Sequence, residues 1–246
     1  MSLNTTELHG FMKEHPATVR VDTTENEPPL ATGLRGVAAD WSADKQVFPI
    51  PWGKAMMWIF LLSDTFIFSC FLVGYMNVRV STTAAWPNVS EAFALHVAGH
   101  EYPLLLIAIM TFDLITSSGT MAMAVNFGYR RDRFKTTLLM LITAAFGAAF
   151  VGMQAFEWTN LIVNEGVRPW GSPLGAAQFG SSFFMITGFH GMHVTAGVIY
   201  LSTIARRVWR GDYDRKGSYE TVEIAGLYWH FVDLVWVFIF AFFYLW

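Results

Sequence analysis

The C-terminal stretch of the chain reads IAGLYWHFVDLVWVFIFAFFYLW from Ile224 to Trp246. At about 1.5 Å per residue, a helix over this stretch is about 34 Å long, enough to cross a hydrocarbon core of about 30 Å. Its interior carries His230 and Asp233, which stand three residues apart and therefore share one helical face. Ionisable side chains are costly in lipid, so this face must look toward other helices. The stretch predicts a membrane span within a helical bundle.

The composition of the whole chain is that of a membrane protein. Of its 246 residues, 54% are hydrophobic and 14% are charged, and the mean hydropathy is +0.39. A soluble domain of this length does not need so large an apolar fraction. The net charge of -3, with no basic cluster outside two short loops, gives no reason to expect a nucleic acid partner. The single cysteine, Cys70, excludes an intrachain disulfide and a cysteine-ligated metal cluster.

The predicted fold class is all-α, an integral membrane bundle of five transmembrane helices with a polar N-terminal tail. Residues 1–50 are polar and rich in acids, and they predict a cytoplasmic, partly disordered tail. Residues 51–246 form the transmembrane domain. Each of its five apolar runs is long enough to span a bilayer and has no Lys or Arg in its interior. The predicted spans are 55–78, 103–127, 136–162, 179–205 and 224–246.

The basic residues between these spans predict the orientation of the chain. Arg79 lies between the first and second spans, and Arg168 lies between the third and fourth. The other two loops carry nine basic residues: Arg130, Arg131, Arg133, Lys135, Arg206, Arg207, Arg210, Arg215 and Lys216. By the positive-inside rule, the N-terminus is expected in the cytoplasm and Trp246 on the periplasmic side.

The first outer loop contains a pattern typical of a helix start. Asn88 can cap a helix and Glu91 can return the hydrogen bond, which predicts a short helix with His96 and His100 on one face. Two histidines at this spacing can ligate a metal, but Glu101 sits off their face. We therefore interpret both as surface histidines.

Every predicted span carries a polar or ionisable side chain within its apolar run. Intramembrane groups of this kind are rare, and they indicate either a function or pairing inside a bundle. We expect Asp64 to be structural, held by a hydrogen bond to another helix or to a lipid ester. The full set is Asp64, Asp113, Gln154, Glu157, His190, His193, His230 and Asp233.

Three chemistries fit this set by residue type. The three-residue spacings of Gln154 with Glu157, His190 with His193 and His230 with Asp233 resemble those of a di-metal centre, but the depths of Glu157 and His230 differ by roughly 15 Å. A haem held between His190 or His193 and His230 has tolerable depths, so a membrane cytochrome b stays open as an alternative. The third is a proton-linked or lipid-binding carboxylate network near mid-membrane, which would use Asp64, Asp113, His193 and Asp233.

Small residues in two spans predict close packing between helices. Ala144, Ala148 and Gly152 recur every four residues in the third span. The histidines of the fourth span are surrounded by glycines at positions 188, 191 and 197. Without side chains in the way, neighbouring backbones can approach closely.

Two long motifs closely resemble the last two helices of subunit III of the haem-copper respiratory oxidases. They are TGFHGMHVTAG at 187–197 and YWHFVDLVWVF at 228–238. FGAAFVGMQAFEW at 146–158 resembles the preceding helix of that family, and LLSDTFIFSCF at 61–71 resembles its helix with a mid-membrane acid. The order and spacing of these motifs are similar to those of the family over residues 52–246.

The chain departs from the mitochondrial-type members of this family in two respects. Those members have seven helices, whereas five are predicted here, a layout that resembles the bacterial members, including quinol oxidases. The acid of the first span is Asp64, where mitochondrial-type members carry glutamate. The resemblance therefore leaves the electron donor, cytochrome c or quinol, open.

The resemblance implies a subunit without redox centres in a bacterial inner-membrane oxidase that reduces oxygen to water and pumps protons. Such a subunit packs on catalytic subunit I, in a complex with subunit II, and supports proton uptake, while haems and copper reside in the partner subunits. A nitric-oxide-reductase-associated homologue is the alternative within the family. Arg207 resembles a residue that binds a phospholipid phosphate. The implied buried polar network comprises Asp64, Glu157, His190, His193, His230 and Asp233.

Overall fold

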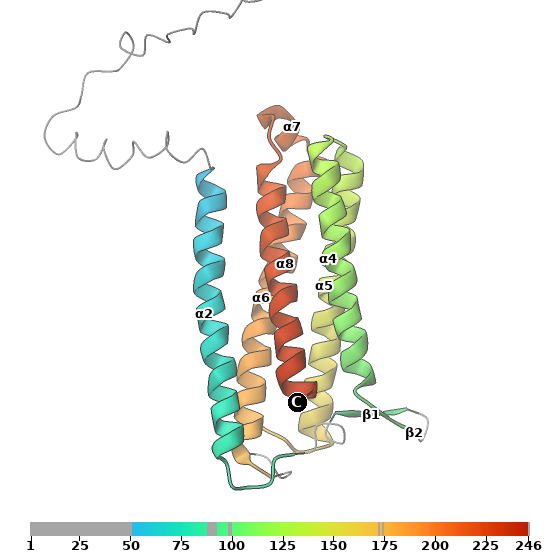
Figure 1. Ribbon diagram of the computed structural model, residues 1–246. Coiled ribbons are helices and arrows are strands. Elements are labelled where there is room, and N and C mark those ends of the chain that lie inside the picture. The colour runs from blue at the N-terminus through green and yellow to red at the C-terminus, as the bar shows by residue number, and fades with distance from the viewer. Residues whose placement is uncertain (1–50, 88–92, 98–99, 172, 174, 246) are drawn as a thin grey trace, which may run out of the picture. The chain divides into compact units, whose positions relative to one another are not determined.

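The computed structural model of the chain describes residues 51–87, 93–97, 100–171, 173 and 175–245 (Figure 1). The predicted tail, residues 1–50, lies outside this described part. The predicted bundle of five membrane-spanning helices is confirmed, because five helices are long and apolar enough to cross a membrane. These are α2 (Trp52–Ser81), α4 (Leu105–Tyr129), α5 (Arg133–Val163), α6 (Ala177–Trp209) and α8 (Glu220–Phe240), which continues into the π-helix η2 (Ala241–Leu245).

Several helices extend beyond the apolar runs that predicted them. The clearest case is α6, whose last turn includes Arg206 and Arg207. Cations are favourable at a helix C-terminus, where unpaired carbonyl groups concentrate negative charge. Helical hydrogen bonding therefore continues into the polar rim, where hydropathy alone would end the helix.

A β-hairpin occupies the segment where the sequence predicts a short helix. β1 (Ala94–Val97) and β2 (His100–Pro103) pair antiparallel, with Val97 opposite His100. The helix prediction is wrong for residues 94–97, while the expected cap at Asn88 and Glu91 lies outside the described residues. A helix this short is marginal on its own, whereas the hairpin pairs backbone groups across two strands.

Helix α8 lies at the centre of the arrangement. It packs against α2, α4 and α6, while α5 packs against α4 and α6. Figure 1 shows α2 at one side of the other spans, with the short helix α7 (Asp212–Lys216) at one end of the bundle and the hairpin at the other. The short connections between α4 and α5 and between α5 and α6 place these consecutive helices antiparallel and side by side, whereas α2 packs on α8 and α6 rather than on α4.

Helices pack closely around Trp229, a fully buried residue of α8. Its ring lies against Gly147 of α5 and Gly197 of α6, where any Cβ atom would overlap the indole. The prediction of close packing is confirmed at Gly197 and at Gly188, which faces Trp158. It is wrong at Gly152 and Gly191, where an added Cβ atom would meet nothing within 4 Å in the described residues.

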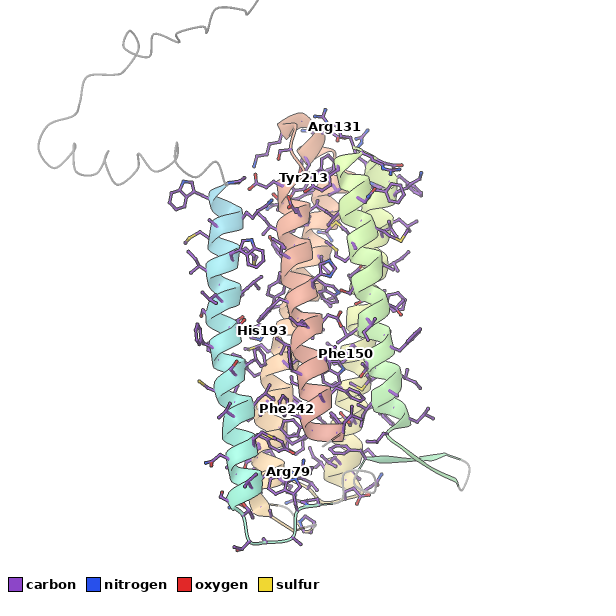
Figure 2. All side chains as sticks on the ribbon, viewed as in Figure 1. Arg79, Arg131, Phe150, His193, Tyr213 and Phe242 are labelled. Carbon is purple, nitrogen blue, oxygen red and sulfur yellow. The ribbon has the colours of Figure 1, made fainter. Side chains whose placement is uncertain are left out.

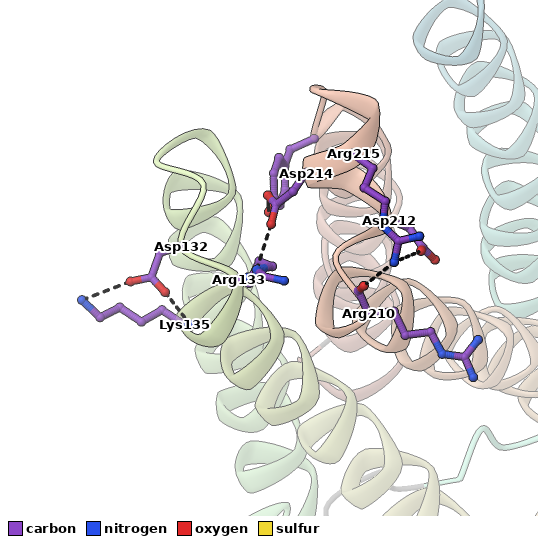
Figure 3. A network of polar contacts seen from close by, with 8 residues as sticks. Asp132, Arg133, Lys135, Arg210, Asp212, Asp214 and Arg215 are labelled. Atoms are coloured by element: carbon purple, nitrogen blue, oxygen red, sulfur yellow. Dashed lines mark hydrogen bonds and ion pairs between the residues drawn. The ribbon is translucent and has the colours of Figure 1, made fainter.

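Ion pairs join the loops at the α7 end of the bundle. Arg133 Nε lies 2.8 Å from Asp214 Oδ2, which connects α5 to α7. The Tyr219 hydroxyl donates to Asp214, and burial together with this carboxylate raises the pKa of Tyr219 to about 12, so the phenol keeps its proton. Lys54 of α2 pairs with Glu223 of α8 at 2.6 Å. Figure 3 shows the polar residues Asp132, Arg133, Lys135, Arg210, Asp212, Asp214 and Arg215 of this end.

Candidate functional site

Asp64 and His193 form a buried pair between α2 and α6. Asp64 Oδ2 lies 3.1 Å from His193 Nε2, and the two residues are 4% and 9% exposed. Asp64 belongs to a stripe at three- and four-residue spacing, the face that a helix turns toward its neighbours. The buried members of this stripe are Leu61, Asp64, Phe68, Leu72 and Tyr75. The expected hydrogen bond between Asp64 and another helix is therefore present.

The second ring nitrogen of His193 fixes the number of protons in this pair. His193 Nδ1 lies 2.8 Å from the carbonyl oxygen of Phe189, which can only accept. Nδ1 therefore carries a hydrogen, and a single proton remains for the contact between Nε2 and Asp64. A protonated acid facing a neutral imidazole and a carboxylate facing an imidazolium both satisfy this contact. Both arrangements have no net charge, which suits a site inside the bundle.

Aromatic side chains enclose the pair. The ring of Phe189 is 4.8 Å from that of His193, and the ring of Phe68 is 5.6 Å from it, both in edge contact. The Tyr228 hydroxyl of α8 donates to the carbonyl oxygen of His193 at 2.9 Å. In Figure 2, His193 lies near the middle height of the bundle on the side of α2. The pair thus connects three helices, α2, α6 and α8.

His190 lies one turn from His193 but in a different environment. It is fully buried, and its ring stacks on Trp236 with centroids 5.3 Å apart and meets Phe150 edge-on. Neither ring nitrogen has a hydrogen-bond partner within the described part of the chain. His190 therefore serves as an aromatic packing element between α5 and α8.

Glu157 forms a second buried site nearer the hairpin end. Gln154 donates to its Oε2 at 2.6 Å, and Tyr244 of η2 donates to Oε1 at 3.2 Å. The π-helix explains how Tyr244 reaches this carboxyl, because its wider turn buries the adjacent residues Phe243 and Tyr244 together. Glu157 thus joins α5 to the C-terminal turn.

His230 and Asp233 lie at the seam between α4 and α8. His230 Nδ1 is 2.5 Å from Ser118 Oγ, and Ser118 also lies within hydrogen-bonding reach of Asp233. Both residues are half-buried, so their shared face looks toward α4, as the three-residue spacing predicts.

Arg207 is exposed at the α7 end of α6. An apolar groove lies between α5 and α6 at the same end, and Arg207 is not among the residues that line it. The groove has a volume of about 470 Å³. It is lined by Arg206 together with Phe134, Leu138, Leu141 and Trp209, among others. The basic residue that lines the groove is therefore Arg206, whereas the resemblance indicates Arg207 as the phosphate-binding residue.

The polar residues of the spans form separate groups rather than one centre. His193 faces Asp64 of α2, His230 faces Ser118 of α4, and Glu157 faces Tyr244. A haem between His193 and His230 would need both rings on one seam, and a di-metal centre would need Glu157 beside the histidines. This arrangement favours local pairing between helices.

Three partners of these groups were not predicted from the sequence. The Tyr244 hydroxyl donates to the Glu157 carboxyl, and the Tyr228 hydroxyl donates to the backbone carbonyl of His193. The third partner is Ser118, which pairs with His230. A tyrosine inside an apolar run is a usable signal, since its hydroxyl needs a partner when buried. Ser118 carries a weaker signal, because serine in a membrane helix commonly bonds its own backbone.

A bundle of five membrane-spanning helices, in which Asp64 pairs with His193 and His230 pairs with Ser118 between helices, defines a polytopic membrane protein with ionisable groups at depth. The model of the family described as cytochrome c oxidase subunit III matches residues 49–246. The chain belongs to this family.

Individual relatives agree with this assignment. Cytochrome c oxidase subunit 3 of Alkalihalophilus pseudofirmus is 33% identical over 189 residues, which cover 76% of this chain and 84% of that protein. The probable quinol oxidase subunit 3 of Staphylococcus saprophyticus is 32% identical over 189 residues, covering 76% of this chain and 86% of that protein. The protein of the same name in Staphylococcus aureus shows the same values.

Proposed function

We propose that this chain is the subunit of a proton-pumping terminal oxidase that packs on catalytic subunit I and carries no redox centre of its own. Haems and copper then belong to the partner subunits, and subunit II completes the core of the complex. The observation that carries this proposal is the buried Asp64–His193 pair, seen in a chain of the subunit III family. It joins helices rather than presenting an open ligand position.

The geometry of the pair favours a structural role for Asp64. A proton relay through an imidazole needs one ring nitrogen to receive a proton and the other to release it. His193 Nδ1 already donates to the carbonyl oxygen of Phe189, so release from this side has no acceptor beyond a backbone group. The pair therefore holds α2 on the bundle, and proton uptake is supported through the assembly of this chain with subunit I.

We further propose a bacterial inner membrane as the location, with the α7 end in the cytoplasm. Nine basic residues in the loops of this end, against two at the hairpin end, support this orientation. The groove lined by Arg206 suits an acyl chain whose phosphate meets an arginine, which supports a bound phospholipid.

Purification of the native complex through a tag on this chain tests the proposal. A haem-containing oxidase of several subunits is expected to co-purify and to consume oxygen. The isolated chain is expected to show no Soret band and no stoichiometric iron or copper. A Soret band in the isolated chain, lost on His230→Ala, would establish the cytochrome b alternative instead.

A quinol oxidase is the second candidate, favoured by relatives named probable quinol oxidase subunit 3 at 32% identity, almost the value of the cytochrome c oxidase relative. Oxygen consumption by the purified complex separates the two. Reduced cytochrome c drives oxygen consumption by a cytochrome c oxidase, and a quinol drives oxygen consumption by a quinol oxidase. An active nitric oxide reductase without oxygen consumption would contradict both.

A further inference from the structure

The groove between α5 and α6 combines apolar side chains with a single basic residue, Arg206. Its apolar part follows α5 from Phe134 to Leu141, a rise of about 10 Å along the helix. Leu138 and Leu141 in this part are 46% and 47% exposed. The volume of about 470 Å³ lies within the range of sites that enclose a small ligand. The groove therefore has room for an apolar chain that lies along the two helices.

Two aromatic side chains stand at the end of the groove nearest α7. The rings of Phe134 and Trp209 have centroids 6.3 Å apart, and the two residues are 59% and 61% exposed. Exposed tryptophan is typical of the level of the lipid headgroups. Arg206 precedes Trp209 by three residues and therefore shares its face of α6. The basic end of the groove thus lies at headgroup level, and its leucines lie at the depth of the acyl chains.

Arg206 forms no ion pair with the described residues. The aspartates at this end of the bundle, shown in Figure 3, pair with other basic side chains: Asp132 with Lys135, Asp212 with Arg215 and Asp214 with Arg133. No carboxylate is among the residues that line the groove. A guanidinium that lacks a carboxylate partner beside apolar surface is suited to an anion that carries an apolar chain.

A second pocket at the same end of the bundle shows the opposite pattern of charge. It is lined by Lys54 and Arg131 together with two acids, Glu220 and Glu223. Lys54 Nζ lies 2.6 Å from Glu223 Oε1, so this pocket supplies the partner of its own cation. The contrast indicates that the groove beside Arg206, and not this pocket, selects a negatively charged ligand.

The groove also holds a hydroxyl group that lacks a partner. Thr137 is 5% exposed, and its Oγ1 makes no hydrogen bond to the described residues. Ser202, on the facing side of the groove, donates to the carbonyl oxygen of Val198 at 2.7 Å. A buried hydroxyl without a partner is costly. Because Thr137 lies one turn deeper than Arg133 at the rim, an ester carbonyl below a phosphate is an acceptor at a suitable depth.

We propose that this groove binds one anionic phospholipid, with its phosphate on Arg206 and an acyl chain along Leu138 and Leu141. A headgroup of the phosphatidylglycerol type is preferred over zwitterionic phosphatidylethanolamine, because no described residue of the lining receives an ammonium group. The site is distinct from Arg207, the residue that the resemblance indicates. This inference rests on the proposed function, which assigns a phospholipid to this groove, and it names the class of that lipid.

Photo-labelling of the complex purified through this chain tests the preference. The probes are phosphatidylglycerol and phosphatidylethanolamine with the same photo-reactive acyl chain, and the label is mapped to peptides of α5 and α6. Phosphatidylglycerol is expected to label the groove about fivefold more strongly, the effect of one basic residue on an anionic lipid. Arg206→Gln is expected to lower this labelling to the level of phosphatidylethanolamine, and Arg206→Lys to keep most of it. Arg210→Gln is the matched control, because it removes one charge from the same end outside the groove, and its labelling is expected to equal that of the wild type.

Equal labelling of the wild type by the two lipids would overturn the proposal, as would unchanged selectivity in Arg206→Gln. An excess of inorganic phosphate is expected to leave the label in place, because it offers no acyl chain to the groove. Displacement by inorganic phosphate would indicate a site for a free anion and would also overturn the lipid assignment. The haem content of the same samples separates this result from the proposed function. Selective labelling of a chain that brings no haem-containing subunit would contradict the proposed function alone.

Discussion

His193 Nε2 lies 3.1 Å from Asp64 Oδ2, while Nδ1 of the same ring lies 2.8 Å from the carbonyl oxygen of Phe189. The second contact assigns a hydrogen to Nδ1, so one proton remains between Nε2 and Asp64. An amide at position 64 satisfies either placement of that proton, because its N–H donates to a neutral imidazole and its oxygen accepts from an imidazolium. Either placement requires a hydrogen-bonding group at this position and no released proton.

We predict that Asp64→Asn assembles with the oxidase and keeps near-normal turnover. Asp64→Ala removes the partner of His193 and leaves a cavity, which is expected to cost about 1–3 kcal/mol of stability for the unpaired histidine alone. It should weaken attachment to subunit I and shorten the working life of the enzyme. Steady-state oxygen consumption, protons released per electron and inactivation during turnover are the measurements. A fully assembled Asn variant with a lowered proton stoichiometry would show that Asp64 exchanges protons.

We predict that replacement by phenylalanine affects the stability of the protein differently at the two histidines of α6. His190→Phe keeps an aromatic ring between Trp236 and Phe150 and removes two unpaired polar atoms, so the melting temperature is expected to stay the same or rise. His193→Phe leaves Asp64 without its partner and is expected to cost about 1–3 kcal/mol. Thermal unfolding of both variants in the same detergent decides this, and equal losses would contradict the distinction.

The length and hydropathy of the spans predict the five helices because a bilayer allows few alternatives to a long apolar helix. The same reasoning finds the buried acids and histidines, whose cost in lipid makes them stand out. The sequence alone does not predict which of these acids and histidines contact one another. Whether His193 meets Asp64 or His230 depends on the rotation of α6 about its axis, and many weak contacts set this rotation together.

Two features were beyond the sequence for identifiable reasons. The hairpin at 94–103 replaces the predicted helix because strand pairing satisfies backbone groups that a short helix leaves unpaired. Gly152 was expected to pack inside the chain, since the four-residue spacing marks a packing face without saying whose helix it meets. Among the described residues, a Cβ atom at this position meets nothing within 4 Å.

The position of the Trp229 ring predicts which glycines of α6 can be replaced by alanine without loss of stability. Gly197→Ala places a Cβ 2.9 Å from the Trp229 ring, in a core fixed by Gly147 on the opposite side. Overpacking of this kind is expected to cost about 1–3 kcal/mol. Gly191→Ala, where a Cβ meets open space, serves as the matched control and is expected to be neutral or stabilising. Thermal unfolding of both variants tests this, and an unchanged melting temperature for Gly197→Ala would contradict the tight packing.

The distribution of basic residues predicts the orientation of the chain. A reporter enzyme that is active only in the periplasm should be active when fused after Trp246 and silent when fused after Arg131. A reporter active only in the cytoplasm should give the opposite result at both positions. Periplasmic activity at Arg131 would reverse the orientation.

Glu157 and Tyr244 are predicted to be energetically coupled. Tyr244→Phe leaves the buried carboxyl with Gln154 as its only donor in the described part of the chain, and Glu157→Met leaves the Tyr244 hydroxyl without its acceptor. Each change is expected to cost about 1–3 kcal/mol, because each strands one buried polar group. Tyr213→Phe is the matched control, since this buried tyrosine makes no side-chain hydrogen bond to the described residues.

The double variant separates this coupling from the loss of packing. When both polar groups are absent, neither is left unpaired, so the double variant should be more stable than the sum of the two single changes predicts. The expected coupling is about 0.5–3 kcal/mol, the range found for residues in direct contact. Thermal or denaturant unfolding of the four proteins of the cycle measures it. Strictly additive losses would mean that Tyr244 stabilises the C-terminal turn through its ring contacts with Phe93 and Phe240 and not through Glu157.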